Sequence, residues 1–273
     1  MRRTVAALIL WVFGPGNAAE AAFERLSIGV RDMALSGSGV ALMGGTDAGA
    51  FNPAASGSPG ARLLSVSYTP SLFGLDDLRH SALACVEPFS WGAVSVSASV
   101  FGCALYRETT FKAGFTVEVA PGCWAGVRCA LMTLRIQDYG SRSTLGVDAG
   151  FLVRLSPLVD LGGALGNLNA PSIGESPERL PQTIALGLTL HPIRAASLCA
   201  AIYSDQLFSP EFRVGAEYSP LQEVTLRGGI CQDPSSYSAG IGFRYSGFSL
   251  DYTYLTHREL GGSHAFGLSI VLE

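Results

Sequence analysis

From residue 62 onward, apolar and polar residues alternate along the chain with a period of two. In the stretch STLGVDAGFLVRL at 143–155, the odd-numbered positions from Leu145 to Leu155 are all apolar, and Asp148 and Arg154 stand among the even-numbered ones. Because successive side chains of a β-strand point to opposite faces of a sheet, each such stretch predicts a strand with two different faces. The chain is therefore expected to be all-β.

About fourteen stretches of this kind follow one another. Most are 9–13 residues long, which is enough to cross a bilayer when a strand is tilted. The predicted strands are 62–70, 78–86, 91–105, 109–119, 123–137, 143–155, 158–166, 180–190, 195–204, 211–219, 222–231, 237–245, 247–255 and 264–272.

The predicted connections between the strands fall into two alternating sets. Short turns such as APG at 120–122 and SG at 246–247 alternate with connections that are generally longer, such as QDYGSRS at 137–143 and NLNAPSIGESPER at 167–179. Short periplasmic turns alternating with longer outer loops are typical of outer-membrane barrels. An even number of strands would bring both ends of the barrel to the periplasmic side.

The composition helps to decide between a soluble protein, a helical membrane protein and a transmembrane β-barrel. Mean hydropathy is +0.32, which is high for a soluble protein, and only 15% of the residues are charged. No run of 18 apolar residues follows the first dozen positions, which argues against membrane-spanning helices. A transmembrane β-barrel distributes its apolar residues over many short strands and explains both observations. The net charge of −4 and the lack of a basic cluster argue against nucleic acid as a partner.

A β-sandwich or a soluble barrel would show the same alternation, because the pattern alone does not say which face points outward. Three observations favour a membrane barrel over these soluble folds. They are the low charge content, the isolated charges on the polar face, and a pattern at the N-terminus that is typical of a signal for export. These predicted inner-face charges are Asp148, Arg154, Glu217, Arg227, Arg244 and Asp251. Aromatic residues near strand ends are expected to form interfacial girdles. They are Trp91, Tyr106, Trp124, Tyr218, Tyr245 and Tyr254.

The N-terminus has the pattern of a secretory signal peptide. Arg2 and Arg3 precede an apolar segment at 4–13, and small residues at 18–22 offer a cleavage site. A buried first strand or helix is the alternative. We therefore divide the chain into a signal peptide at 1–22, an N-terminal segment at 23–61 and a barrel at 62–273.

Residues 30–55 contain a motif that resembles a known family. Arg31-Asp32-Met33-Ala34-Leu35-Ser36-Gly37-Ser38-Gly39-Val40-Ala41-Leu42, followed by Asp47-Ala48-Gly49-Ala50-Phe51-Asn52-Pro53-Ala54, is similar to the N-terminal hatch motif of the FadL/PorV superfamily of outer-membrane barrels. Asn167-Leu168, Leu180-Pro181 and Leu186-Gly187-Leu188 resemble a block of its PorV/PorQ-like branch. The closing hairpin of the same branch is resembled by Asp251-Tyr252-Thr253-Tyr254, His257, Glu259-Leu260-Gly261, Ser263-His264 and Phe266-Gly267-Leu268-Ser269.

The resemblance implies a fourteen-stranded transmembrane barrel whose lumen is plugged by an N-terminal hatch at 23–61. Small residues would let this segment coil tightly inside the lumen, and Asn52-Pro53 would form a rigid turn toward the first strand. A disordered linker is the alternative interpretation. A phosphate-binding loop is disfavoured, because Gly37-Ser38-Gly39 lacks the third glycine and no GK[ST] sequence follows.

Motifs for covalent or metal chemistry are weak in this chain. The six cysteines form no CxxC pair, and we interpret them as small apolar strand residues in preference to a disulfide framework. His257, Glu259 and His264 could suggest a metal site, but they fall within the family's hairpin block. No GxSxG motif is present. We expect no cofactor, no metal and no enzymatic activity.

The function expected from the resemblance is a FadL-like channel for hydrophobic or small amphipathic compounds. The alternatives are a PorV/PorQ-like component of a protein secretion or surface-attachment system and a sealed structural barrel of the outer membrane. The expected partners are outer-membrane lipid, a long-chain fatty acid or another hydrophobic ligand, and, under the alternative, secretion-system proteins.

Candidate functional residues come from the hatch motif and from the predicted inner face. A purely structural role, in which the lumen charges pair with one another and hold the hatch, is the competing interpretation. The candidates are Arg31, Asp47, Asn52, Pro53, Arg128, Arg154, Arg213, Arg227 and Arg244.

Overall fold

The structure is a computed structural model, and parts of the N-terminus and of three loops lie outside the residues that it describes. The predicted signal peptide up to residue 21 and the candidate Asp47 both fall outside them. The described residues are 22–23, 29–44, 51–56, 60–174, 179–205, 209–232 and 235–272.

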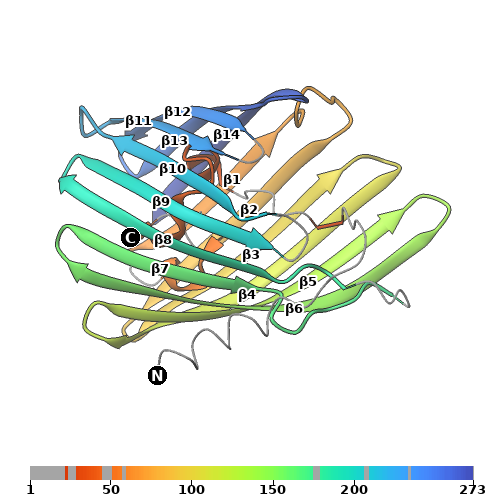
Figure 1. The fold of residues 1–273 in the computed structure, drawn as a ribbon, viewed down its shortest axis with the longest axis horizontal. Coiled ribbons are helices and arrows are strands. Elements are labelled where there is room, and N and C mark those ends of the chain that lie inside the picture. The colour runs from red at the N-terminus through yellow and green to blue at the C-terminus, as the bar shows by residue number, and fades with distance from the viewer. Residues whose placement is uncertain are drawn as a thin grey trace.

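Within the described residues, fourteen antiparallel strands form one closed barrel (Figure 1). Each strand pairs with the next in sequence, and β14 pairs with β1 to close the wall. The prediction of a fourteen-stranded antiparallel barrel is confirmed. The strands are β1 (Arg62–Thr69), β2 (Arg79–Phe89), β3 (Gly92–Gly102), β4 (Tyr106–Ala120), β5 (Cys123–Ile136), β6 (Gly140–Ser156), β7 (Val159–Gly166), β8 (Thr183–Ile193), β9 (Ala196–Asp205), β10 (Glu211–Tyr218), β11 (Val224–Cys231), β12 (Ser236–Tyr245), β13 (Phe248–His257) and β14 (Gly261–Leu272).

Several predicted strand ends differ from the observed ones by up to three residues, and two of these differences have a clear local cause. The expected loop 137–143 is mostly strand, because β5 and β6 stay paired up to Ile136 and Gly140. Strand β8 begins three residues later than predicted. Leu180 instead belongs to the preceding connection, where its amide bonds to the Pro171 carbonyl and its side chain is buried beside Met132.

The apolar face of the barrel points outward. Phe111, Leu131 and Ile202 on this face are 48%, 43% and 46% exposed. Thr116 and Thr189 on the opposite face are fully buried inside the barrel. Soluble barrels and sandwiches have the reverse arrangement, so the structure resolves the question that the alternation left open.

The described parts of the N-terminal segment lie inside the barrel, as the short helices in Figure 1 show. They contain α2 (Val30–Ala34), η1 (Gly39–Ala41) and η2 (Pro53–Ser56), and most of their side chains are buried. Helix α2 packs against β11–β14, η1 against β7–β9, and η2 against β3–β6. Contacts with so many strands place this segment across the interior.

Inward-facing glycines allow this close approach. A Cβ atom built on any of eight strand glycines would come within 3.0 Å of an atom of the N-terminal segment. Such distances are shorter than ordinary van der Waals contact, so a side chain at these positions would force its neighbours to shift. We call these eight residues the glycine belt. They are Gly126, Gly150, Gly162, Gly187, Gly215, Gly229, Gly240 and Gly267.

The close packing at the glycine belt predicts different effects of alanine substitution at two adjacent glycines. A Cβ at Gly229 would lie 2.4 Å from the Leu35 carbonyl carbon, whereas at Gly228 its nearest neighbour would be the Ser238 oxygen at 3.7 Å. We expect Gly229→Ala to lower the free energy of unfolding by about 1–3 kcal/mol through overpacking. Gly228→Ala is the matched control and should be near neutral. Urea unfolding in lipid vesicles measures both, and equal effects would contradict the close packing.

Two aromatic residues differ from the predicted girdle. Trp91, Tyr218, Tyr245 and Tyr254 are exposed on the outside, but Trp124 is buried in the interior. Tyr106 also departs from the predicted girdle, because its hydroxyl bonds to the buried Glu108 carboxylate at 2.5 Å. The structure pairs none of the six cysteines in a disulfide. None of the helices in the described ranges has the length and hydropathy required to cross a membrane.

Candidate functional site

A row of polar side chains lines the interior near one end of the barrel. We call this end the short-turn end, because the turns β2–β3, β4–β5, β6–β7, β8–β9, β10–β11 and β12–β13 lie there. Each member of the row stands within four residues of its strand's end. We call the row the mouth belt. Its members are Arg154 on β6, Asp160 on β7, His191 on β8, Ser197 on β9, Glu217 on β10, Arg227 on β11 and Asp251 on β13.

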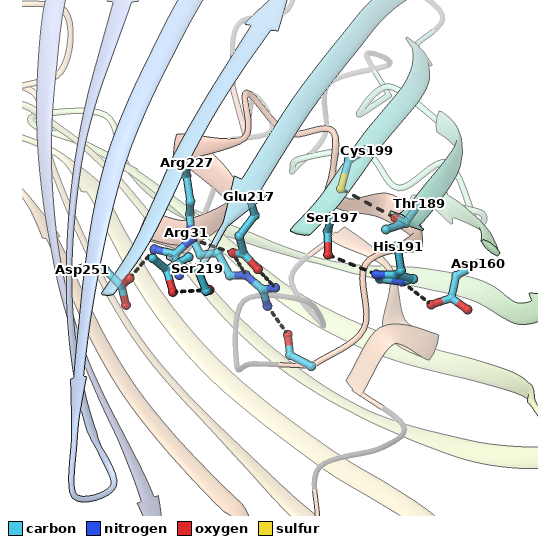
Figure 2. Close-up of polar contacts among 12 residues, drawn as sticks. Arg31, Asp160, Thr189, His191, Ser197, Cys199, Glu217, Ser219, Arg227 and Asp251 are labelled. Carbon is cyan, nitrogen blue, oxygen red and sulfur yellow. Dashed lines mark hydrogen bonds and ion pairs between the residues drawn. The ribbon is translucent and has the colours of Figure 1, made fainter. Parts of the chain in front are cut away.

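One half of the mouth belt is an ion network that reaches the N-terminal segment (Figure 2). Arg31 of α2 donates through Nε and Nη2 to the two carboxylate oxygens of Glu217, both at 2.8 Å. Arg227 donates to Glu217 at 2.7 Å and to Asp251 at 2.5 Å. Two cations and two anions balance one another, and Arg31 also donates to the Gly44 carbonyl at 2.9 Å.

Space for this network comes from β12, which places Gly242 between its members. A Cβ at Gly242 would lie 2.5 Å from an Asp251 carboxylate oxygen and 2.8 Å from an Arg227 nitrogen. Any larger residue would separate the two charges. The network therefore depends on a glycine as well as on the charged residues.

The other half of the mouth belt centres on Asp160, whose side chain is 1% exposed. One carboxylate oxygen accepts from Arg154 Nε and the other contacts His191 Nε2, each at 3.1 Å. The second ring nitrogen of His191 lies 3.1 Å from the Ser197 hydroxyl, as Figure 2 shows. With the proton on Nε2, the ring donates to Asp160 and accepts from Ser197.

The order Ser197–His191–Asp160 matches the residue types of a hydrolase triad. In this barrel, however, Arg154 already neutralises Asp160, whereas a triad aspartate stabilises an imidazolium. We therefore interpret the Ser197–His191–Asp160 arrangement as a set of positioned hydrogen bonds. Sequence reasoning missed His191, Asp160 and Ser197, because they come from three strands and form no local motif.

Two hatch-motif candidates anchor the N-terminal segment to the wall. The fully buried Asn52 donates to the carbonyls of Val40 and Phe151, each at 2.9 Å, and accepts from the Ala54 amide at 3.0 Å. The Pro53 carbonyl accepts from the Thr116 hydroxyl at 2.6 Å. Both residues thus join η2 to the barrel, and these hydrogen bonds go to residues outside the mouth belt.

Three further arginine candidates lie apart from one another. Arg128 pairs with Asp148 across β5 and β6, with donor distances of 3.0 and 2.7 Å, and both are buried. Arg213 donates to Glu211 at 2.5 Å near the opposite end of the barrel, with its guanidinium carbon 4.6 Å from the Tyr203 ring centroid.

The last candidate, Arg244, is exposed near the short-turn end of β12. The structure therefore brings together Arg31, Arg154 and Arg227 in the mouth belt region, and it places Asn52, Pro53, Arg128 and Arg213 elsewhere.

The residues weighed as metal ligands do not converge. His257 Nδ1 accepts from the backbone amides of Glu259 and Leu260 in the β13–β14 turn. His264 points outward, where its Nδ1 lies 2.8 Å from the Tyr252 hydroxyl. Across the part of the chain that the structure describes, no three His, Cys, Asp or Glu side chains are grouped as a metal site would require.

A closed antiparallel barrel with an apolar outer wall and a polar interior defines the class of fold. Among solved structures, the chain is similar to the Pseudomonas putida toluene transporter TodX, with a TM-score of 0.68 and 12% identity over 92% of this chain and 100% of that chain. It is also similar to a Pseudomonas aeruginosa FadL homologue, with a TM-score of 0.64 and 13% identity over 89% of this chain and 97% of that chain.

These likenesses concern the fold, because the sequence identities are low. No protein-family model matches the sequence, and a comparison with curated proteins found no match. The chain has the barrel fold of FadL-type transporters. The resemblance to FadL-like barrels is supported at this level, and the likeness lends no support to the PorV/PorQ-like branch.

Proposed function

We propose that the protein is an outer-membrane channel of FadL-like type for hydrophobic or small amphipathic compounds. The observation that carries this proposal is the inverted polarity of the barrel, whose apolar side chains cover the outer wall. Such a wall is stable against lipid and would be unfavourable against water. Similarity to the toluene transporter TodX supports transport of apolar solutes over a role in catalysis.

We further propose the location and the role of the N-terminal segment. Residues 1–22 serve as a cleaved signal peptide for export to the outer membrane, with the short-turn end facing the periplasm. Residues 23–61 serve as a hatch that controls passage through the lumen. The glycine belt and the Asn52 hydrogen bonds support this role, because they seat the segment against most of the strands.

Uptake by liposomes that contain the refolded mature chain tests the channel. We expect uptake of a labelled long-chain fatty acid or of toluene, with exclusion of a small hydrophilic dye. A heat-modifiability gel confirms that the barrel is folded. Folded barrels that take up none of these solutes would contradict the channel and would leave a sealed structural barrel.

A further inference from the structure

Three arginines lie in one row on the outer wall, at the end of the barrel opposite the short turns. They come from β2, β4 and β5, which belong to one side of the wall (Figure 1). Directly paired residues share a face of the sheet, and Arg107 stands four residues before the outward-facing Phe111 on β4. All three are exposed, and we call them the arginine row. In the register, Arg79 pairs with Gly102, Gly102 with Arg107, and Arg107 with Arg135.

The arginine row has no counter-charge in the protein. No ion pair among the described residues involves any of its members. The carboxylates of the adjoining β1–β2 and β5–β6 connections, which are Asp76, Asp77 and Asp138, form no ion pair with them. Like charges directly opposite each other destabilise a sheet. The pair Arg107 and Arg135 is therefore unfavourable unless an anion from outside the chain neutralises it.

Next to the arginine row, the outer wall changes first to hydroxyl groups and then to apolar side chains. Two residues nearer the short-turn end, the register aligns Ser81, Val100, Thr109, Thr133 and Ser143. Two residues further, it aligns Leu83, Ala98, Phe111, Leu131 and Leu145, which are all exposed. The order of charge, hydroxyl and hydrocarbon matches a lipid that carries anionic groups and hydroxyls above its acyl chains.

The height of the arginine row fits the edge of a membrane. Between Arg107 and Val117 on β4, the outward-facing side chains are uncharged. These two residues are ten positions apart, which corresponds to roughly 25 Å along the barrel axis at about 3.3 Å per residue and a tilt of about 40°. The apolar band of outer-membrane barrels is about 25 Å tall. The guanidinium groups are therefore expected just beyond the hydrocarbon, at the level of lipid headgroups.

We propose that the arginine row binds the phosphate groups of a lipid in the outer leaflet, with the acyl chains along the apolar wall of β2–β6. Guanidinium binds phosphate through two parallel N–H groups, which makes arginine suited to this contact. Arg79 and Arg107 are two strand spacings apart, about 10 Å, with only Gly102 between them. A headgroup with two phosphates therefore finds a separate guanidinium for each. This inference rests on the proposed outer-membrane location and orientation, and it concerns the outer wall and not the lumen.

Binding of two matched lipids tests the site. The probes are diphosphoryl and monophosphoryl lipid A with the same sugars and acyl chains, which differ by one phosphate. Native mass spectrometry of the refolded mature chain in dodecyl maltoside micelles measures the bound lipid at each lipid concentration. We expect the wild type to bind the diphosphoryl lipid more tightly. Arg107→Gln combined with Arg135→Gln should weaken this binding by about tenfold, because two exposed charged contacts are lost.

Two further variants isolate the contact. Arg107→Lys combined with Arg135→Lys keeps both charges and removes the planar forks, so its affinity should fall between those of the wild type and the glutamine variant. Arg194→Gln combined with Arg258→Gln is the control. It removes the same net charge from exposed positions in the β8–β9 and β13–β14 turns, away from the arginine row, and it should bind like the wild type.

The outcomes are distinct. Weaker binding of the diphosphoryl lipid in the glutamine variant, with the control unchanged, supports the site. Equal binding of the two lipids by the wild type, wild-type affinity in the glutamine variant, or an equal loss in the control overturns it. If a heat-modifiability gel shows that the glutamine variant does not fold, the lysine variant decides by the same criteria. Lipid binding that depends on the row without any solute uptake by liposomes would refute the channel and keep the site, and the reverse result would refute only the site.

Discussion

Replacing Glu217 by alanine is expected to lower the free energy of unfolding by about 3–5 kcal/mol, the usual cost of breaking a buried ion pair. Arg31 and Arg227 would lose a shared anion, and only Asp251 would remain to balance them. Arg31 belongs to the N-terminal segment, so the loss should also loosen that segment. Thermal unfolding of the barrel in lipid and limited proteolysis of the segment measure both effects.

An exposed ion pair provides the control. Arg62 and Glu87 also pair across two neighbouring strands, but their side chains are 52% and 35% exposed. Glu87→Ala should therefore change stability little, because water already solvates both charges. A double replacement of Glu217 and Arg31 by alanine should recover part of the loss. If the single variant at Glu217 were as stable as the variant at Glu87, the ion network would have no role in holding the segment.

Asn52→Ala is expected to lower the free energy of unfolding by about 2–4 kcal/mol, because it leaves buried backbone groups without partners. Its side chain contacts the Val40 and Phe151 carbonyls and the Ala54 amide, all inside the barrel. We expect passage of a small hydrophilic dye through reconstituted liposomes to increase, and to increase further when Pro53→Ala is added. Dye efflux measures this leak.

Asn169 provides a matched control for Asn52. It also uses both ends of its amide, accepting from the Val147 amide at 2.9 Å and donating to the Leu145 carbonyl at 2.7 Å, but at an exposed position. Water can replace those bonds, so Asn169→Ala should neither leak dye nor lower stability to the same extent. Unchanged leakage in the Asn52 and Pro53 variants would count against the hatch.

The strands could be predicted from sequence because their signal is local. Alternation within a strand such as 143–155 directly reflects which side chains share a face, and short turns mark where the strands end. Which of the two faces points outward, in contrast, is not determined by local sequence. It became visible only in the closed barrel, where Phe111 is exposed and Thr116 is buried.

The candidate site was only partly predictable for a similar reason. Arg154 and Arg227 could be assigned to the inner face from the alternation of apolar and polar residues in their strands. Arg31 could be singled out from its motif. The partners that make them a site were not assignable, because the shared carboxylate Asp160 and the ring of His191 come from separate strands. Trp124 was misplaced because proximity to a strand end does not specify the face on which a side chain lies.

The seating of the N-terminal segment has a consequence for the order of folding. The segment precedes the barrel in the chain, yet the wall closes through β1 and β14, whose register joins Arg62 to Leu272. Pairing between such distant parts of a chain is slow, because the entropy of loop closure must be overcome first. The glycine belt fits the segment too closely for late entry through a finished rim. The final step of assembly is therefore expected to be closure of the β1–β14 seam around a segment that is already inside, and until then both strands present open edges that need protection from aggregation.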